Sequence, residues 1–376
     1  MEEQTIDGLS PQEKTTDSLS PQTKKGIIIV AIAAVAAILL YMVLPYNTNV
    51  NKALALLLFI ATLWLTEAIH ITITALLVPV IAVLVGIGSG SGESFKALGL
   101  SSALSNFANP TIFLFFGGFA LATALHVQKI DTKIAMKLVS FSGSKLGYAA
   151  IAICGATALL SMWVSNTATA AMMLPLALCI LGGKENLNRD HGTTVFLLLG
   201  IAYSASIGGL GTLVGSPPNA IASAELGYGF FDWMKIGLPL AIILWPLMML
   251  ALYFLFKPNL SKKVNMDVDV DIPWTTNRII TIIVFAITAF LWIFSTQIKA
   301  ATGIPLNDGL IAIMAAIAIV ILGLASWSQI SNNTEWGILM LFGGGLCLSA
   351  ILKDTGASLV IGEQVAAVFG SSHPIV

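Results

Sequence analysis

Long apolar stretches alternate with short polar connections along most of this chain. A helix needs about 20 mainly apolar residues to cross the hydrocarbon layer of a bilayer, and several stretches reach that length. The pattern therefore predicts an all-α polytopic membrane protein embedded in a lipid bilayer. The expected apolar segments lie near residues 26–45, 53–69, 71–88, 110–126, 147–181, 193–225, 237–256, 279–297, 308–324 and 336–352.

Two of these stretches do not look like simple spans. Residues 147–181 are too long for one helix and carry a polar Ser-Asn-Thr triplet near their middle, which predicts a re-entrant hairpin with its tip at the triplet. Residues 193–225 contain Gly-Ser-Pro-Pro-Asn at 215–219, and tandem proline removes backbone donors. We therefore expect a helix that is broken within the membrane, which lipid tolerates only where the break faces protein or water.

Charge is scarce and its distribution predicts the topology. The sequence is 57% hydrophobic and 10% charged, against about 25% charged residues in a soluble protein. With a cytoplasmic N-terminus and a hairpin at 147–181, thirteen of the 18 lysine and arginine residues fall on the inside, as the positive-inside rule requires. A single span there would place Lys257 to Arg278 outside. No basic cluster indicates a nucleic-acid partner.

The chain also contains an internal repeat. Residues 113–121 resemble residues 339–348 at an offset of 226, and the two copies are expected to run in opposite directions, as in inverted-repeat transporters. The alternative is that the shared Phe-Gly-Gly is a common helix-packing motif. The same offset from Ser165 places a second polar triplet near position 391, so the second repeat is expected to be incomplete in a chain that ends at Val376.

The polar triplet offers ligands for an ion and for a carboxylate. Hydroxyls of Ser161 and Ser165 lie one helical turn apart, and with the Asn166 amide oxygen and a carbonyl of Gly215 they form a neutral oxygen cluster suited to Na⁺. Helix N-termini that follow the triplet favour an anion. The side chains expected to donate hydrogen bonds to this anion are those of Ser165, Asn166, Thr167 and Ser216. The alternative is that the triplet only joins packed helices.

Other chemistries find little support. An intramembrane enzyme needs a nucleophile with a base, or a metal cluster, and no His, Asp or Glu lies in the spans near Ser165 or Ser216. We expect neither catalytic residues nor an organic cofactor. Intramembrane ionisable residues are functional candidates, but Glu67, His70 and His126 lie near span ends and are expected to be structural. The three cysteines are expected to be small core residues; they are Cys154, Cys179 and Cys347.

Four motifs together resemble the divalent anion:sodium symporter family, of which bacterial sodium-coupled dicarboxylate transporters are the prototype. The motifs are residues 162–169, 215–219, 64–68 and 336–345. The resemblance implies homodimers in the inner membrane, an elevator-type mechanism, and symport of several Na⁺ with a C4-dicarboxylate such as succinate, malate or fumarate. By position it places Na⁺ on Ser161, Ser165, Asn166 and Gly215. It places the substrate on Ser165, Asn166, Thr167 and Ser216.

The same resemblance implies a domain organisation. A disordered cytoplasmic tail, 1–25, is followed by scaffold spans at 26–127, an interfacial helix at 128–146 and half of a transport domain at 147–256, which comprises the hairpin 147–181, the broken span 193–225 and the span 237–256. A cytoplasmic loop, 257–278, scaffold spans of the second repeat, 279–353, and a truncated interfacial segment, 354–376, complete it.

Two rival functions remain open at this point. The first is a carrier of the same fold for sulfate, citrate or another oxyanion, because these anions accept the same donors. The second is a non-transporting membrane fragment, because the family's second hairpin and second triplet are missing. We expect the intact protein to transport and the chain ending at Val376 not to.

Overall fold

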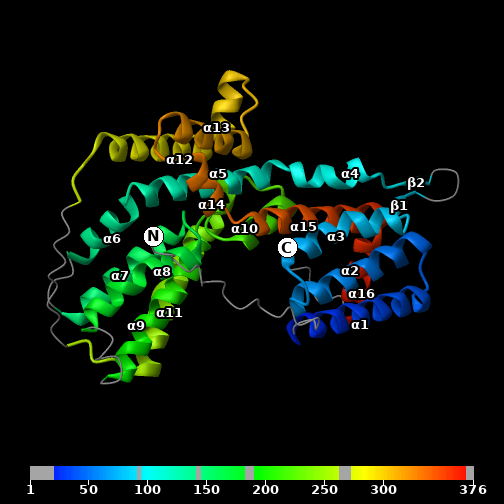
Figure 1. The fold of residues 1–376 in the computed structure, drawn as a ribbon, viewed down its shortest axis with the longest axis horizontal. Helices are drawn as coiled ribbons and strands as arrows, with labels where there is room; N and C mark the ends of the chain where they lie inside the picture. The colour runs from blue at the N-terminus through cyan, green and yellow to red at the C-terminus, as the bar shows by residue number, and fades with distance from the viewer. Residues whose placement is uncertain (1–20, 91–94, 141–144, 183–189, 262–271, 370–376) are drawn as a thin grey trace, which may run out of the picture. The chain divides into compact units, whose positions relative to one another are not determined.

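The computed structural model describes residues 21–90, 95–140, 145–182, 190–261 and 272–369. The described part is almost entirely helical and divides into two compact units, which are treated separately below. Seven of its helices are long and apolar enough to cross a membrane. Together these findings confirm the predicted all-α polytopic fold (Figure 1).

The first unit comprises residues 1–98 and 351–376. Its helices α1, α2 and α3 follow one another, and α16 packs on α2. Two residues on either side of the segment 91–94 form an antiparallel pair of short strands, β1 and β2, with Gly88 opposite Ala97. The elements are α1 (Pro21–Val43), α2 (Thr48–Thr66), α3 (Ile71–Leu84), β1 (Gly88–Ser89), β2 (Lys96–Ala97) and α16 (Ala357–Phe369).

The second unit, residues 99–350, carries the polar motifs. It holds two short helices, α4 and α14, of which α4 belongs to the candidate span Leu100–Val127, and the long helix α15 ends just beyond the unit. Its elements are α4 (Leu100–Leu104), η2 (Ser105–Ala108), α5 (Pro110–Val127), α6 (Ile130–Ser140), α7 (Leu146–Ser161), α8 (Asn166–Ile180), α9 (His191–Gly209), α10 (Pro217–Leu226), α11 (Phe230–Phe256), α12 (Thr276–Thr302), α13 (Asp308–Ile321), α14 (Trp327–Asn333) and α15 (Trp336–Thr355).

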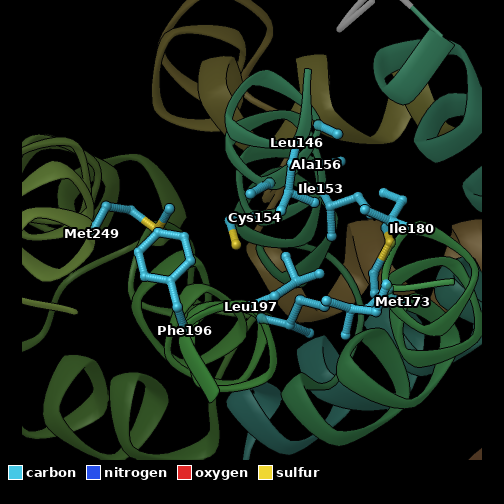
Figure 2. Close-up of a cluster of buried hydrophobic side chains, with 14 of the residues drawn as sticks. Leu146, Ile153, Cys154, Ala156, Met173, Ile180, Phe196, Leu197 and Met249 are labelled. Carbon is cyan, nitrogen blue, oxygen red and sulfur yellow. The ribbon is translucent and has the colours of Figure 1, made fainter. Parts of the chain in front are cut away.

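Two cores hold the second unit together. In the first, α7 and α8 pack as a helical hairpin against α9 and α11; Figure 2 shows Ile153 and Cys154 of α7 among Met173, Leu197 and other apolar side chains of this core. In the second, α5 packs along α13, where glycine permits close approach of the helices. A Cβ atom at Gly117 would lie 2.5 Å from the carbonyl oxygen of Ala312.

Both unusual segments are interrupted where the sequence predicts, while the re-entrant path through a membrane stays a prediction. Residues 147–181 form two helices, α7 and α8, joined at 162–165, and neither helix alone reaches the length of a full span. Residues 193–225 form α9 and α10, separated by Leu210–Ser216, with Pro217 and Pro218 in the first turn of α10. Proline is favoured there because the first N–H groups of a helix have no intrahelical partner.

Some boundaries differ from the prediction. Helix α1 begins at Pro21, so residues 21–25, which we placed in the tail, are helical. Lysine and glutamine are good helix formers, and a helix can extend beyond its apolar part where it meets water. The interfacial helix expected over 128–146 is α6, Ile130–Ser140. Residues 1–20, residues 262–271 of the loop 257–278 and residues 370–376 lie outside the described residues.

The repeat spacing is visible in the helices themselves. Helix α5 begins at residue 110 and α15 at residue 336, an interval of 226 residues, and each is followed by a shorter helix, α6 or α16. The first glycine of each pair also packs closely, since a Cβ atom would lie 2.5 Å from Ala312 at Gly117 and 2.1 Å from the ring of Phe107 at Gly343. The opposite orientation of the two copies in a membrane stays a prediction.

One expectation about the cysteines is wrong. Cys154 and Cys347 are buried, as expected of small core residues, but Cys179 is exposed. It lies near the end of α8, on the side of that helix opposite its buried residues Met173, Ala177 and Ile180. Helix periodicity, which a composition argument does not consider, explains the difference.

Candidate functional site

The tip of the hairpin is a short turn between two helices. Helix α7 ends at Ser161 and α8 begins at Asn166, with Ser165 as its N-cap residue. The Ser165 hydroxyl accepts a hydrogen bond from the backbone N–H of Ala168 at 3.4 Å. The N–H groups of Asn166 and Thr167 belong to the first turn, where helices have no internal acceptors. The positive end of α8 is therefore presented at the tip.

The break between α9 and α10 is held by side chains of its own sequence. The amide nitrogen of Asn219 donates to the carbonyl oxygens of Gly209, at 2.7 Å, and Thr212, at 2.8 Å. The indole N–H of Trp233 donates to the carbonyl of Leu210 at 3.0 Å. These bonds replace the helical bonds that the break removes, as a polar backbone buried from water requires.

The break is also bonded to the hairpin tip. The Thr212 hydroxyl donates to the carbonyl of Met162 and accepts from the N–H of Gly215. A Cβ atom at Gly215 would lie 2.8 Å from the carbonyl oxygen of Ser161 and 2.6 Å from that of Gly209. Real Cβ atoms do not come so close, so only glycine fits between the two segments.

Oxygen atoms of two helices, α7 and α9, and of the break converge on the Asn166 side chain. One terminal atom of its amide group lies 2.7 Å from the Ser161 hydroxyl, 2.9 Å from the Ala205 carbonyl and 3.3 Å from the Gly215 carbonyl. Ser161, Ala205 and Gly215 are buried. Sequence reasoning brought together Ser161, Asn166 and Gly215 but missed Ala205, because a backbone carbonyl carries no signal in the sequence.

Two helix ends give this oxygen cluster its electrostatic character. Ser161 is the last residue of α7, and Ala205 lies in the last turn or so of α9. Carbonyl groups at the C-terminal end of a helix carry the negative end of its dipole. The cluster is therefore uncharged but electronegative, which is the environment that broken helices offer to coupling cations in transporters.

A cavity lies on the other side of the same helical turn. It has a volume of about 390 Å³, and Ser165 and Thr167 lie in its wall. Asn166 points to the oxygen cluster while its two neighbours line the cavity, since successive helical residues are about 100° apart. The remaining wall is formed by Phe119, Ala122, Thr123, His126, Asp131, Val164, Ala168, Ala171, Met172, Asn332, Asn333 and Glu335.

The cavity wall includes a hydrogen-bonded pair of side chains, His126 and Asp131. His126 Nδ1 lies 2.9 Å from Asp131 Oδ2, and the Asp131 side chain is 3% exposed while the imidazole is 65% exposed. The second carboxylate oxygen of Asp131 accepts from the N–H and the hydroxyl of Thr132. We expected His126 to be structural, and its contact with Asp131 is of that kind; the pairing itself was not foreseen.

The last predicted site residue, Ser216, lies where the break enters α10. It is half-buried and is the N-cap residue of that helix, but its hydroxyl makes no capping bond. Ser165, by contrast, caps α8 and lines the cavity. The assignment of Na⁺ to Ser161, Ser165, Asn166 and Gly215, and of substrate to Ser165, Asn166, Thr167 and Ser216, stays a prediction.

Broken helices around a polar cluster in an apolar, polytopic chain define a membrane carrier. The comparison with known families agrees: the chain belongs to the citrate transporter family (CitMHS), whose sequence model matches residues 61–376. The resemblance to divalent anion:sodium symporters is thereby confirmed, and the protein is a transporter and not an enzyme.

Individual relatives support the same assignment. An uncharacterized transporter of Haemophilus influenzae is 50% identical over 361 residues, which cover 93% of this chain and 75% of the relative. An uncharacterized transporter of Methanocaldococcus jannaschii is 37% identical, covering 74% of this chain and 62% of the relative. The sodium-dependent dicarboxylate transporter SdcS of Staphylococcus saprophyticus is 31% identical over 72% of this chain, which spans 58% of its length.

Proposed function

We propose that the protein carries a C4-dicarboxylate across the inner membrane in symport with Na⁺. The observation that carries the proposal is the two-sided tip of the hairpin. Asn166 faces an uncharged oxygen cluster, and Ser165 and Thr167 face a cavity about 390 Å³ in volume. One helical turn thus provides two adjacent binding places, one for a cation and one for an anion.

The oxygen cluster fits a cation that prefers neutral oxygen ligands. If the Asn166 amide places its oxygen toward the cluster, the carbonyl oxygens of Ala205 and Gly215 face it with no hydrogen between them, and only the Ser161 hydroxyl can donate. A cation between these atoms removes the repulsion. The SdcS relatives are named as sodium-dependent transporters, and we assign Na⁺ to this cluster.

The cavity fits the carboxylate end of a small anion. The N-terminus of α8 supplies unpaired N–H groups and the positive end of a helix dipole, and the hydroxyls of Ser165 and Thr167 add donors. The names of the SdcS relatives favour a dicarboxylate. Citrate is the second candidate, because it is the substrate that names the matching family.

Uptake measurements on vesicles test the proposal. The protein, expressed from its complete reading frame, is reconstituted into liposomes, and labelled succinate, citrate and sulfate are offered under an inward Na⁺ gradient or a K⁺ gradient of equal strength. We expect succinate uptake with Na⁺ and little with K⁺, with citrate as a weaker competitor. Equal uptake with both cations would exclude symport, and uptake of sulfate alone would exclude the dicarboxylate.

Assembly and movement are part of the same proposal. We propose a homodimer in which the hairpin, α9, α10 and α11 form the moving half of an elevator, with the N-terminus in the cytoplasm. Accessibility of single cysteines to a membrane-impermeant thiol reagent tests the topology: Lys145→Cys is expected to react from the inside and Lys235→Cys from the outside. Labelling of both from one side would contradict the predicted orientation.

A further inference from the structure

Helix α5 forms part of the wall of the cavity at the hairpin tip. The N-terminal end of α8 supplies Ser165 and Thr167, and α5 lines the same cavity at positions 119, 122, 123 and 126. Residues at these intervals lie on one side of a helix. His126, in the last turn of α5, therefore borders the same space as the hydroxyl groups that we assign to the anion.

The charged side chains of this wall are unevenly distributed. Among the described residues that border the cavity, His126 is the only basic one, while Asp131 and Glu335 are acidic. Helices α8 and α14 carry no charged side chain. If one carboxylate of a dicarboxylate lies at the start of α8, the second lies in a space where two ionised carboxylates repel it. A positive charge on His126 offsets this repulsion.

The contact with Asp131 determines which imidazole nitrogen is free. Both carboxylate oxygens of Asp131 accept hydrogen bonds, Oδ1 from Thr132 and Oδ2 from His126 Nδ1 at 2.9 Å. An ionised carboxylate has no hydrogen to donate, so Nδ1 carries the hydrogen of this bond. Within the described part of the chain no group bonds to Nε2, and the imidazole is 65% exposed. Nε2 is thus available to a ligand in the cavity.

We propose that His126 is a substrate-binding residue that holds the second carboxylate of the anion through Nε2, an inference that rests on the proposed function. In the imidazolium both ring nitrogens are donors, so Nδ1 stays on Asp131 while Nε2–H donates to the carboxylate. In the neutral ring Nε2 offers only a lone pair, which repels a carboxylate. Asp131 is a positioning residue, because it orients the ring without touching the anion.

This contact makes the second carboxylate a condition of tight binding. The anion site then extends from the start of α8 to the end of α5 and discriminates a dicarboxylate from a monocarboxylate of the same length. Such discrimination depends on a polar group of the protein that stays without a partner when the wrong ligand binds. His126 would therefore determine substrate specificity.

A comparison of succinate with butyrate tests the contact. Butyrate has the same four-carbon chain but lacks the carboxylate that His126 is proposed to hold. The complete protein, purified in detergent at saturating Na⁺, is titrated with labelled succinate, and butyrate is measured as a competitor. His126→Gln removes the charge and keeps a polar side chain. His70→Gln is the matched control, because His70 caps α3 in the first unit and is not in the wall of this cavity.

Near pH 6.5 we expect His126→Gln to weaken succinate binding by about 10- to 100-fold, the contribution of a hydrogen bond to a charged group. Competition by butyrate should not change, and His70→Gln should bind both ligands like the wild type. Equal losses for succinate and butyrate in His126→Gln would show that His126 only supports the fold and would overturn the proposal. Unchanged succinate binding in His126→Gln would overturn it as well.

The pH dependence of the wild type is a second test, which needs no variant. An ordinary imidazole is charged near pH 6.5 and loses its proton towards pH 8.5, so the preference for succinate over butyrate should fall by about 10-fold or more over this range. In His126→Gln the preference should stay constant. A wild-type preference that does not change with pH would overturn the contact even if His126→Gln does not fold. A wild type that binds no succinate in Na⁺ would instead overturn the proposed function, and the contact with it.

Discussion

The side-chain amide of Asn219 donates to the carbonyl oxygen of Gly209 across 2.7 Å, at the point where α9 ends. The same nitrogen donates to Thr212 O at 2.8 Å, and Asn219 is 2% exposed. A single buried side chain thus satisfies two carbonyl groups that the helix break would otherwise leave without donors. The geometry of the break, and with it the position of Gly215, depends on this residue.

Asn219→Leu is therefore expected to destabilise the protein. Each buried carbonyl left without a donor costs about 1–3 kcal/mol, so we expect a loss on the order of 3 kcal/mol for the pair. Thermal unfolding in detergent measures the change, with Asn333→Leu as the control, because Asn333 is exposed and donates only within α14. Equal stability of Asn219→Leu and Asn333→Leu would show that the break does not depend on the amide.

Gly215→Ala tests the close contact between the break and the hairpin. The added methyl group would lie 2.6 Å from Gly209 O and 2.8 Å from Ser161 O, so the break must move away from the tip. We expect the Na⁺-dependent rise in thermal stability to be lost. Gly345→Ala is the control, since a Cβ atom there meets nothing within 4 Å. A normal response to Na⁺ in Gly215→Ala would contradict the proposed position of the cation.

The contact between His126 and Asp131 predicts that substitution of His126 alone destabilises the protein more than substitution of both residues. His126→Leu leaves the buried Asp131 carboxylate with Thr132 alone, and an unsatisfied buried acceptor costs about 1–3 kcal/mol. In the double variant with Asp131→Leu, no buried charge remains, and we expect part of that stability to return. A double-mutant cycle of thermal unfolding measures how much of the stability returns. Strictly additive losses would mean that the two side chains do not interact.

Two aspartates accept hydrogen bonds at the start of α11, Asp232 from that helix and Asp308 from the first turn of α13, and they allow a matched comparison. The half-buried carboxylate of Asp308 accepts from the N–H of Phe230 at 2.7 Å, whereas Asp232, in the first turn of α11, is exposed and pairs with Lys235. Asp308→Ala should destabilise the protein by about 1–2 kcal/mol, because it removes a charged acceptor at a helix N-terminus. Asp232→Ala should change stability by less than about 0.5 kcal/mol, as exposed pairs contribute little. Equal effects in chemical or thermal unfolding would contradict this assignment.

Asp308 also supports an aromatic stack that reaches the hairpin tip. Trp163 packs on Phe230 at 6.0 Å between ring centroids, and Phe230 packs on Trp292 at 4.8 Å. No sequence pattern predicted this stack, because Trp163 and Trp292 lie about 130 positions apart along the chain.

The periodicity of the sequence determined most of the architecture. Apolar length predicted the helices, the position of the Ser-Asn-Thr triplet predicted the turn between α7 and α8, and Pro217 and Pro218 predicted the break before α10. These features follow from local physics. A helix in lipid must satisfy its backbone internally, and proline or a polar cap ends it wherever the chain places them.

Only the tertiary structure decided how the polar residues divide their roles. The sequence gathered Ser165, Asn166 and Thr167 into one group, whereas the fold turns Asn166 toward Ala205 O and its neighbours toward the cavity. No sequence pattern identifies the carbonyl of Ala205 as the neighbour of Asn166, or Asp131 as the buried partner of His126. Which backbone oxygen or carboxylate meets a given side chain is fixed by helices packing across long sequence separations, and a local pattern carries no record of that.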